Sequence, residues 1–195
     1  MDLFDKALCY ATEKHSGQVR KGSNTPYIVH PVEVAGIIAT MSDDKELLAA
    51  AILHGTVEDT DATIEEIREL FGKRVSLLVL TETENKREGQ SPEETWVIRK
   101  EESLIMLENT KDIGVKMLWM GDKLSNMRSI ANDYRKEGSA IWNHFHQKDP
   151  KMQAWYYLSI AKYLSVLHDY PAYQEYVSLV KSVFKDYLEN SDYEI

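Results

Sequence analysis

The residues best suited to chemistry follow directly on an apolar run. Residues 47–53 (LLAAAIL) predict a buried helix, and His54, Glu58 and Asp59 come just after it. A carboxylate beside a buried helix needs a partner, which is usually a metal ion, another cation or hydrogen-bond donors. We therefore expect these three side chains to belong to one site. The alternative for the two acidic residues is an exposed acidic loop.

Two further segments can complete a metal site. His30 lies in segment 27–31 (YIVHP), and Asp122 lies in segment 120–126 (MGDKLSN). Taken singly, His30 could cap a helix and His54 could bond a carbonyl group, but an unpaired buried Asp122 is costly. Together the two imidazoles and the carboxylate can bind one divalent cation. This mixture of ligands suits Mn, Fe, Co, Ni or Zn better than Mg or Ca.

A positively charged loop could bind the anionic part of a ligand. Arg20 and Lys21 precede Gly22 and Ser23, and the chain as a whole carries a formal net charge of -9. An acidic chain attracts an anion through a local cluster of positive charge, and an arginine can both stack and donate two hydrogen bonds. The loop lacks the Gly-Lys-Ser/Thr of a P-loop, and the net charge argues against a general nucleic-acid binder. A solvated turn is the alternative for this loop.

Four segments, taken in order, form a pattern over roughly the first 135 residues. They are KHSGQVRKGS at 14–23, PYIVHPVEVA at 26–35, HGTVEDT at 54–60 and DKLSNMR at 122–128. This pattern resembles the HD-domain phosphohydrolases, and specifically the alarmone (ppGpp) hydrolases found in RelA/SpoT proteins and small alarmone hydrolases. The four segments are specific together, whereas any one of them alone is not. The resemblance implies an all-α fold, the HD-domain helical bundle.

The resemblance also implies a reaction and the residues that carry it. The reaction removes the 3′-pyrophosphate from ppGpp or a related guanosine nucleotide, which leaves GDP or GTP and pyrophosphate. The implied cofactor is Mn2+, and Glu58 and Asp59 are the implied catalytic pair, which takes the proton of the attacking water and orients that water. The implied metal ligands are His30, His54 and Asp122. The implied substrate-binding residues are Arg20, Lys21, Ser23 and Asn126.

The chain departs from the family pattern at two positions. Gly55 stands where the His-Asp signature has its Asp, so the ligands offer one negative charge instead of two, and weaker metal binding should follow. We expect space beside Gly55 where the missing carboxylate would have reached. Trp119 replaces a Lys that the family usually carries, which alters the pocket. Three explanations of Gly55 stay open: an enzyme with a displaced ligand, a natural pseudoenzyme and an inactivating substitution.

The rest of the chain predicts one helix after another and no strand. Cys9, in the first helix, should be a small core residue. We expect a single hydrolase domain over residues 1–195, with C-terminal helices at about 150–190 packed on it. Surplus aromatic residues in 152–188 leave a homo-oligomer open. The helices are expected over residues 2–14, 31–41, 45–56, 64–71, 74–83, 92–109, 112–134, 150–168 and 172–189.

The sequence favours a cytoplasmic enzyme. No apolar run reaches the ~18 residues that a membrane-spanning helix needs, and the amino terminus lacks the basic start of a signal peptide. The expected function is a (p)ppGpp 3′-pyrophosphohydrolase, weakened by Gly55. One alternative is a catalytically silent nucleotide-binding protein of the same fold, which would bind nucleotide without turnover. A helical interaction protein, which would bind no nucleotide, is another.

Overall fold

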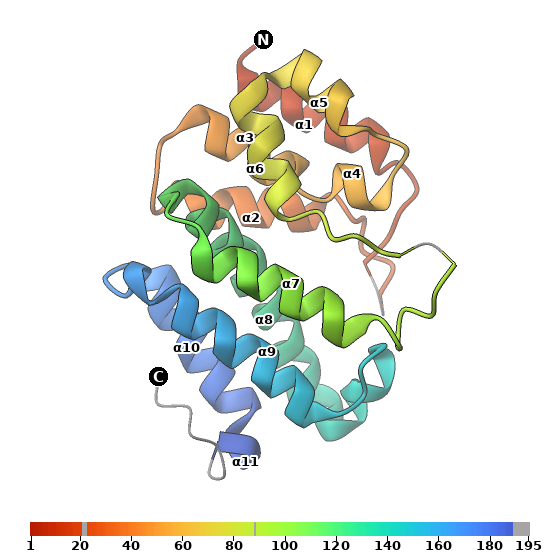
Figure 1. The fold of residues 1–195 in the computed structure, drawn as a ribbon, viewed down its shortest axis with the longest axis vertical. Coiled ribbons are helices and arrows are strands. Elements are labelled where there is room, and N and C mark those ends of the chain that lie inside the picture. Colours follow the sequence, from red (N-terminus) through yellow and green to blue (C-terminus); the bar gives the residue numbers. More distant parts are fainter. Residues whose placement is uncertain (21–22, 88, 189–195) are drawn as a thin grey trace. The chain divides into compact units, whose positions relative to one another are not determined.

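The computed structural model describes residues 1–20, 23–87 and 89–188, and it is built from helices (Figure 1). Within these ranges the one extended pairing is an isolated bridge between Val19 and Pro26. The all-α prediction is therefore confirmed.

The chain divides into two compact units. The first consists of Met1–Glu84 and Asp112–Ser125, and the second of Asn85–Lys111 and Asn126–Ile195. Helix α8 (Ile113–Glu137) is continuous and contributes its first part to one unit and its second part to the other. Our expectation of a single domain with the C-terminal helices packed on it is not tested by this division and stays a prediction.

The first unit is organised around α3 (Lys45–Leu53). This helix packs against α1 (Leu3–Lys14), α2 (Val29–Ala39) and α6 (Lys73–Thr81). The side chains of α3 from Ala49 to Leu53 are fully buried, as a helix surrounded by other helices requires. The unit also contains α4 (Thr56–Asp59), α5 (Ile64–Phe71) and the first part of α8.

Local signals in the sequence fix where these helices begin and end. α3 begins after Asp44, whose carboxylate accepts hydrogen bonds from two backbone N–H groups of the first turn. α5 begins after Thr63, whose hydroxyl accepts a hydrogen bond from the N–H of Glu66. Gly72, at a φ of 96°, ends α5 in a conformation that favours glycine. The predicted bounds of α5 are thus confirmed.

The predicted helix over residues 45–56 is wrong at its end. α3 stops at Leu53, and the separate helix α4 begins at Thr56. The Thr56 hydroxyl donates a hydrogen bond of 2.7 Å to the carbonyl oxygen of Leu53, which satisfies one of the carbonyl groups left open at the end of a helix. Gly55, between the two helices, has a low helix propensity. The break leaves His54 at the end of one helix and the acidic pair on the next.

Helix α8 meets α2 at Gly121, where the two helices approach closely. A Cβ atom at Gly121 would lie 2.8 Å from Cγ1 of Ile38 and 3.1 Å from Cγ1 of Val34. The absence of a side chain at this position therefore sets the distance between the helices. It also brings Asp122 and Ser125 of α8 into the interior, where their exposed fractions are 5% and 0%.

The prediction that Cys9 is a core residue is wrong. α1 buries Ala7 and Ala11 completely, whereas Cys9 is exposed. Cys9 is two positions from each alanine, and two positions correspond to about 200° around a helix. Its side chain therefore points away from the buried face.

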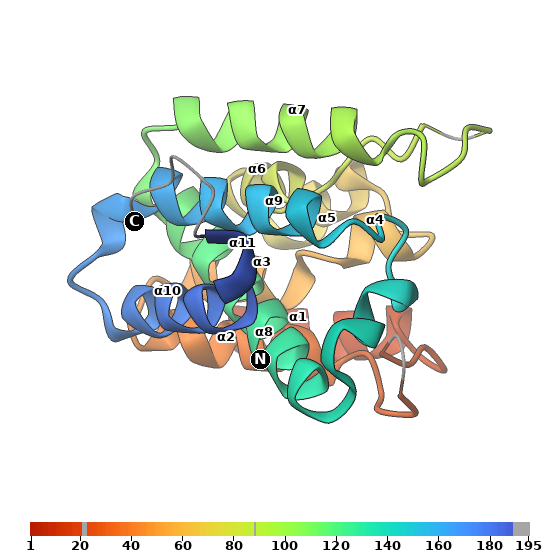
Figure 2. The same ribbon diagram turned by 90° about the horizontal axis from the view of Figure 1, so that it is seen from below.

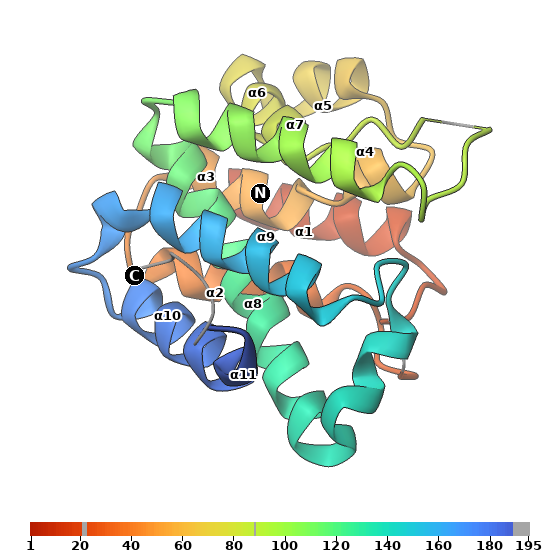
Figure 3. The same cartoon turned by 60° about the horizontal axis from the view of Figure 1, so that its bottom comes forward.

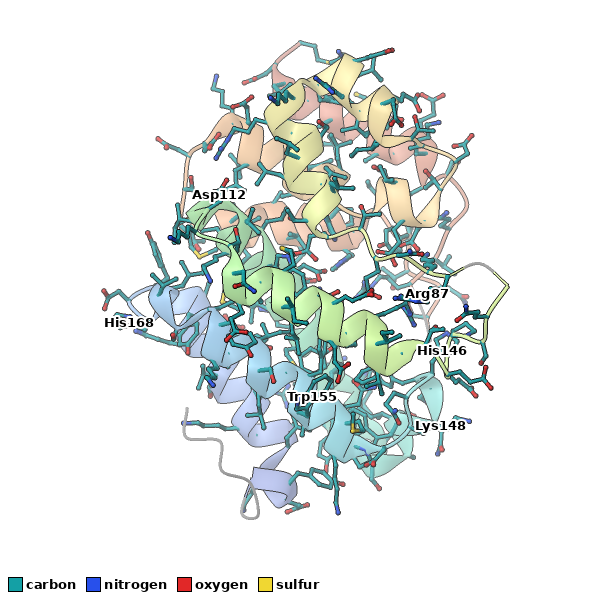
Figure 4. All side chains as sticks on the ribbon, viewed as in Figure 1. Arg87, Asp112, His146, Lys148, Trp155 and His168 are labelled. Atoms are coloured by element: carbon teal, nitrogen blue, oxygen red, sulfur yellow. The ribbon has the colours of Figure 1, made fainter. Side chains whose placement is uncertain are left out.

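In the second unit, α9 (Pro150–Tyr163) lies between α7 (Trp96–Asn109) and α10 (Pro171–Val183), as Figure 2 and Figure 3 show. Trp155 of α9, labelled in Figure 4, makes an edge contact with Trp96, at 6.3 Å between ring centroids. Aromatic packing thus joins α9 to α7. The unit also contains the second part of α8, η1 (Gly138–His144), η2 (Ser165–Leu167) and α11 (Lys185–Leu188).

The C-terminal helices are shorter than predicted. The helix expected over residues 150–168 ends at Tyr163 and gives way to the short turn η2. The helix expected over 172–189 ends at Val183 and is followed by α11, and residue 189 lies outside the described residues. None of the helices in the described ranges combines the length and the apolar composition that a membrane crossing requires.

Substitution by alanine should change the free energy of unfolding in opposite directions at two glycines on neighbouring helices. Gly121→Ala should lower the free energy of unfolding by about 1–3 kcal/mol, because the added methyl group meets Ile38 in a packed interior. Gly36→Ala should raise it by about 0.5–1 kcal/mol, because Gly36 lies within α2 and nothing approaches its Cβ position within 4 Å. Urea denaturation followed by circular dichroism measures both. Unchanged stability of Gly121→Ala would contradict the close approach of α8 to α2.

Candidate metal centre

Three helices of the first unit bring two imidazoles and a carboxylate together. His30 lies on α2, His54 at the end of α3 and Asp122 on α8, and their exposed fractions are 4%, 6% and 5%. The Nε2 atoms of the two histidines are 3.2 Å apart. Oδ1 of Asp122 lies 3.0 Å from Nε2 of His30 and 3.5 Å from Nε2 of His54. The three residues predicted as metal ligands therefore converge on one point.

These distances fit a single bound ion. Ligand atoms about 2.1 Å from one ion lie about 3.0 Å apart at right angles and about 3.4 Å apart in a tetrahedron. The three separations between the candidate ligand atoms, 3.0, 3.2 and 3.5 Å, match this range. In the part of the chain that the structure describes, no second group of His, Cys, Asp and Glu gathers in this way.

Hydrogen bonds direct the Nε2 atoms of both histidines to the centre. Nδ1 of His54 lies 2.6 Å from the carbonyl oxygen of Ala51, which can only accept, so Nδ1 carries the hydrogen. Nδ1 of His30 lies 2.9 Å from Oγ of Ser125, and that hydroxyl donates its hydrogen to Oε2 of Glu33 at 2.7 Å. His30 therefore also donates through Nδ1. Nε2 of each neutral ring keeps its lone pair, which is the form that binds a metal ion.

The electrostatics of the centre favour a cation. Burial alone raises the pKa of Asp122, but the charge of Lys123 and the hydrogen bonds that His30 and His54 donate when protonated at Nε2 hold it well below its usual range. Burial opposes the charged form of His54, yet the hydrogen bond and the charge of Asp122 raise its pKa. Burial lowers the pKa of His30. Three atoms with lone pairs thus surround a point that a proton or a divalent ion can fill, and two imidazoles with one carboxylate fit a transition-metal ion.

The expectation of space beside Gly55 is wrong. A Cβ atom at Gly55 would lie 2.8 Å from the hydroxyl oxygen of Tyr27. That hydroxyl donates a hydrogen bond of 3.2 Å to Oδ2 of Asp59, and the ring contacts His15 and His30 at centroid distances of 4.5 and 5.9 Å. Burial raises the pKa of Tyr27, so the hydroxyl keeps its hydrogen and remains a donor. An aromatic side chain therefore fills the place that a carboxylate at residue 55 would need.

The predicted catalytic pair lies on α4, next to the predicted ligands in sequence. Glu58 is half-buried, and its Oε2 accepts a hydrogen bond of 3.4 Å from the N–H of Glu84. Asp59 is exposed, and its backbone carbonyl accepts a hydrogen bond of 2.8 Å from Nε2 of Gln18 while its carboxylate accepts from Tyr27. Hydrogen bonds from other segments thus orient both acids. Their catalytic roles stay predictions.

The predicted substrate-binding residues come from two segments of the chain, the loop before α2 and helix α8. Arg20 lies in the loop before α2. Burial lowers the pKa of His30 most, and the charges of His54 and then Arg20 lower it further, so the guanidinium acts on the centre electrostatically. Ser23 is exposed, and its hydroxyl bonds the backbone of the same loop. Lys21 lies outside the described residues, and Asn126 belongs to the second unit. Their roles stay predictions.

A buried charge cluster beside Asp122 was not predicted from the sequence. Nζ of Lys123 donates a short hydrogen bond to Oδ2 of Asp122 and another, of 3.3 Å, to Oε2 of Glu82. Nζ of Lys123 also lies 4.4 Å from the ring centroid of Trp119. Trp119, which departs from the family pattern, therefore makes a cation–π contact with the ammonium group. Burial raises the pKa of Glu82 to about 7, against the opposing charge of Lys123.

Two other residues near the centre, Glu33 and Ser125, could have been predicted from their spacing in the sequence but were not. Glu33 follows His30 by three residues, and Ser125 follows Asp122 by three residues. Residues three apart lie on the same face of a helix, so each is placed to orient a ligand. Ser125 bonds both His30 and Glu33, which joins the two helices behind the centre.

The chain is similar to known proteins over most of its length. It matches the HD domain over residues 7–150. It is 39% identical over 127 residues to the guanosine-3′,5′-bis(diphosphate) 3′-pyrophosphohydrolase of Aquifex aeolicus (strain VF5), a match that covers 65% of this chain and 18% of that protein. The chain thus spans less than a fifth of the length of the curated relatives that it matches.

Two solved structures resemble this fold. The structure of lmo0812 from Listeria monocytogenes EGD-e matches with a TM-score of 0.69 and 32% identity, over 82% of this chain and 96% of that one. A metazoan ortholog of SpoT that hydrolyses ppGpp matches with a TM-score of 0.70 over 95% of this chain and 96% of that one; at 24% identity it shows a shared fold alone. HD-domain hydrolases use a divalent metal ion, which the donor set of His30, His54 and Asp122 fits. Because the matched residues, 7–150, make up more than half of the sequence, this chain belongs to the HD domain family.

Proposed function

We propose that this chain is a metal-dependent phosphohydrolase that removes the 3′-pyrophosphate from ppGpp or a related guanosine nucleotide. The observation that carries the proposal is the convergence of His30, His54 and Asp122 in a member of the HD domain family. The substrate class comes from the Aquifex aeolicus relative, whose name states this reaction. A cytoplasmic location, a homo-oligomeric state and the absence of a nucleic-acid partner stay predictions.

The metal that we propose is Mn2+. His30 and His54, through Nε2, and Asp122, through Oδ1, would hold it. When bound, a divalent ion lowers the pKa of water and offsets the charge of a phosphate group. Three protein ligands leave room in the coordination sphere for water and substrate, as in catalytic metal sites generally.

The acidic pair on α4 would handle the proton of the attacking water. The water oxygen bonds to the phosphorus that is joined to the ribose 3′-oxygen, and the bond between this phosphorus and the 3′-oxygen breaks. One carboxylate, Glu58 or Asp59, accepts the proton of the water, and the other orients the water. The 3′-oxygen leaves as a hydroxyl after it takes up a proton. Tyr27 supports these steps because its hydrogen bond fixes the Asp59 carboxylate.

Positive charge in the loop before α2 would bind the nucleotide. The chain has a net charge of -9, so an anionic ligand needs local cations. Arg20 and Lys21 would line the guanosine pocket, since an arginine can stack on a base and donate to an oxyanion. Ser23 and Asn126 would complete the contacts, with Asn126 at the nucleotide sugar.

A catalytically silent nucleotide-binding protein of the same fold is the second candidate. The observation that favours it is the environment of Gly55, which offers no carboxylate and whose neighbouring space holds the Tyr27 hydroxyl. The predicted ligands then supply one negative charge, from Asp122, which weakens the attraction for a dication. Measurement of turnover separates this candidate from the first.

The unaltered protein should release pyrophosphate from ppGpp only when Mn2+ is present. His54→Ala should lower the rate by about a hundredfold, because it removes a ligand from the centre. His168→Ala should leave the rate unchanged, because His168, labelled in Figure 4, is an exposed residue of the second unit. Chromatography of the nucleotide products measures the reaction. Binding of ppGpp without pyrophosphate release would instead support the silent binder.

A carboxylate at residue 55 should raise activity once the Tyr27 hydroxyl is removed. Gly55→Asp alone must displace this hydroxyl, which lies 2.8 Å from the new Cβ atom. The matched control for Gly55→Asp/Tyr27→Phe is Tyr27→Phe. Compared with this control, the double variant should bind Mn2+ more tightly and hydrolyse the nucleotide about tenfold faster. A tenfold increase in rate corresponds to about 1.4 kcal/mol of transition-state stabilisation. Titration calorimetry and product chromatography measure the two effects. Equal rates in the two proteins would show that the missing charge does not limit the site.

Arg20→Ala should weaken nucleotide binding about tenfold and leave Mn2+ binding unchanged, because Arg20 is proposed to contact the ligand and not the ion. Arg68→Ala is the matched control, since it removes an exposed arginine from α5. Fluorescence polarisation of a labelled guanosine nucleotide measures the first affinity, and calorimetry measures the second. Equal loss of both affinities, or of neither, would contradict the assignment of the pocket.

A further inference from the structure

One buried carboxylate beside the metal centre has no role in the function proposed so far. Glu82 directly follows α6, and its side chain is 3% exposed. Burial of a carboxylate is costly unless charges or hydrogen bonds compensate for the loss of water. Its Oε2 accepts a hydrogen bond from Lys123, but within the described residues its Oε1 has no hydrogen-bond partner. A buried oxygen in this state indicates a further partner, such as an ion or a water molecule.

Glu82 is linked to the centre in two ways. Nζ of Lys123 bonds Oε2 of Glu82 and Oδ2 of Asp122, so one ammonium group joins the two carboxylates. α6, which Glu82 follows, packs on α3, which His54 follows. The charges of Glu82 and His54 also act on each other. Glu82 therefore belongs to the same electrostatic cluster as the predicted ligands.

The net charge of this cluster explains why a second carboxylate would strengthen the binding of a divalent cation. With neutral histidines, Asp122 and Lys123 carry opposite charges and together present no net charge to a dication. Gly55 adds none. Glu82, when ionised, makes the cluster negative again, and in a buried site one charge changes the attraction for a dication strongly.

We propose that Glu82 is a second carboxylate of the metal centre and supplies the negative charge that Gly55 lacks. The inference rests on the metal site of the proposed function. Its supports are the burial of Glu82, the shared ammonium group of Lys123 and the oxygen Oε1, which has no donor among the described residues. The competing explanation is that Glu82 forms only a structural ion pair with Lys123. In that case the loss of its charge would change the affinity for the metal only if it also disturbed the fold.

The test is the affinity of the metal-free chain for Mn2+ alone, measured by titration calorimetry without nucleotide. Glu82→Gln keeps the shape of the side chain and removes its charge, so it should weaken Mn2+ binding about tenfold, which corresponds to about 1.4 kcal/mol. Glu69→Gln removes the same charge from an exposed position of α5 and should change the affinity less than about twofold. Equal affinities of the unaltered chain and Glu82→Gln would overturn the role of Glu82. No Mn2+ binding by the unaltered chain would overturn the proposed function itself.

Two further measurements separate charge from shape. Glu82→Asp keeps the charge, so it should bind Mn2+ within about threefold of the unaltered chain. A loss as large as that of Glu82→Gln would show that packing, and not charge, matters, and would overturn the proposal. In the Tyr27→Phe background, Glu82→Gln should weaken Mn2+ binding about tenfold. In the Gly55→Asp/Tyr27→Phe background it should weaken Mn2+ binding less than about threefold, because the carboxylate at residue 55 then supplies the charge. Equal losses in both proteins would show that Glu82 does not stand in for residue 55.

Discussion

Three lone-pair atoms that share one buried point are the constraint on which the first unit depends. In their neutral forms, Nε2 of His30 and of His54 cannot donate, and the Asp122 carboxylate cannot donate either. At separations of 3.0 to 3.5 Å in a water-poor interior these atoms repel one another unless a cation lies among them. The helices are arranged to allow this: α3 ends at Leu53 so that His54 follows it, and Gly121 brings α8 against α2.

The sequence predicted the three residues that converge, because each lies in a segment that matches the family pattern. Spacing of three residues could also have identified Glu33 and Ser125, since a helix keeps such residues on one face. The Tyr27 hydroxyl beside Gly55 had no such signal, because this contact joins residues far apart in sequence and depends on how the segment before α2 packs. The helix prediction failed at residue 56, where a side chain competed with the backbone, and the burial prediction failed at Cys9, which lies on the exposed face of α1.

The two departures from the family pattern both change the charge near the centre. Gly55 removes a negative charge from the position next to His54, and Trp119 removes a positive charge from the helix that carries Asp122. The Trp119 ring lies beneath Lys123, whose ammonium bonds Asp122 on one side and Glu82 on the other. A dication binds according to the net charge around it and not according to any single ligand. Loss of the Asp at residue 55 therefore does not by itself determine the affinity of the centre.

Burial divides the candidate site into two parts with different physical demands. The predicted ligands are at most 6% exposed, which strengthens their attraction for an ion, because little water screens it. The acidic pair is half-buried or exposed, which suits the proposed role of these groups toward water and a nucleotide. Its helix has four residues, and its position depends on hydrogen bonds from Gln18, Tyr27 and the backbone of Glu84. Because these donors lie outside the packed helices, the structure that orients the acids is distinct from the one that holds the ligands. The orientation of the acidic pair can therefore change while the three predicted ligands stay in place.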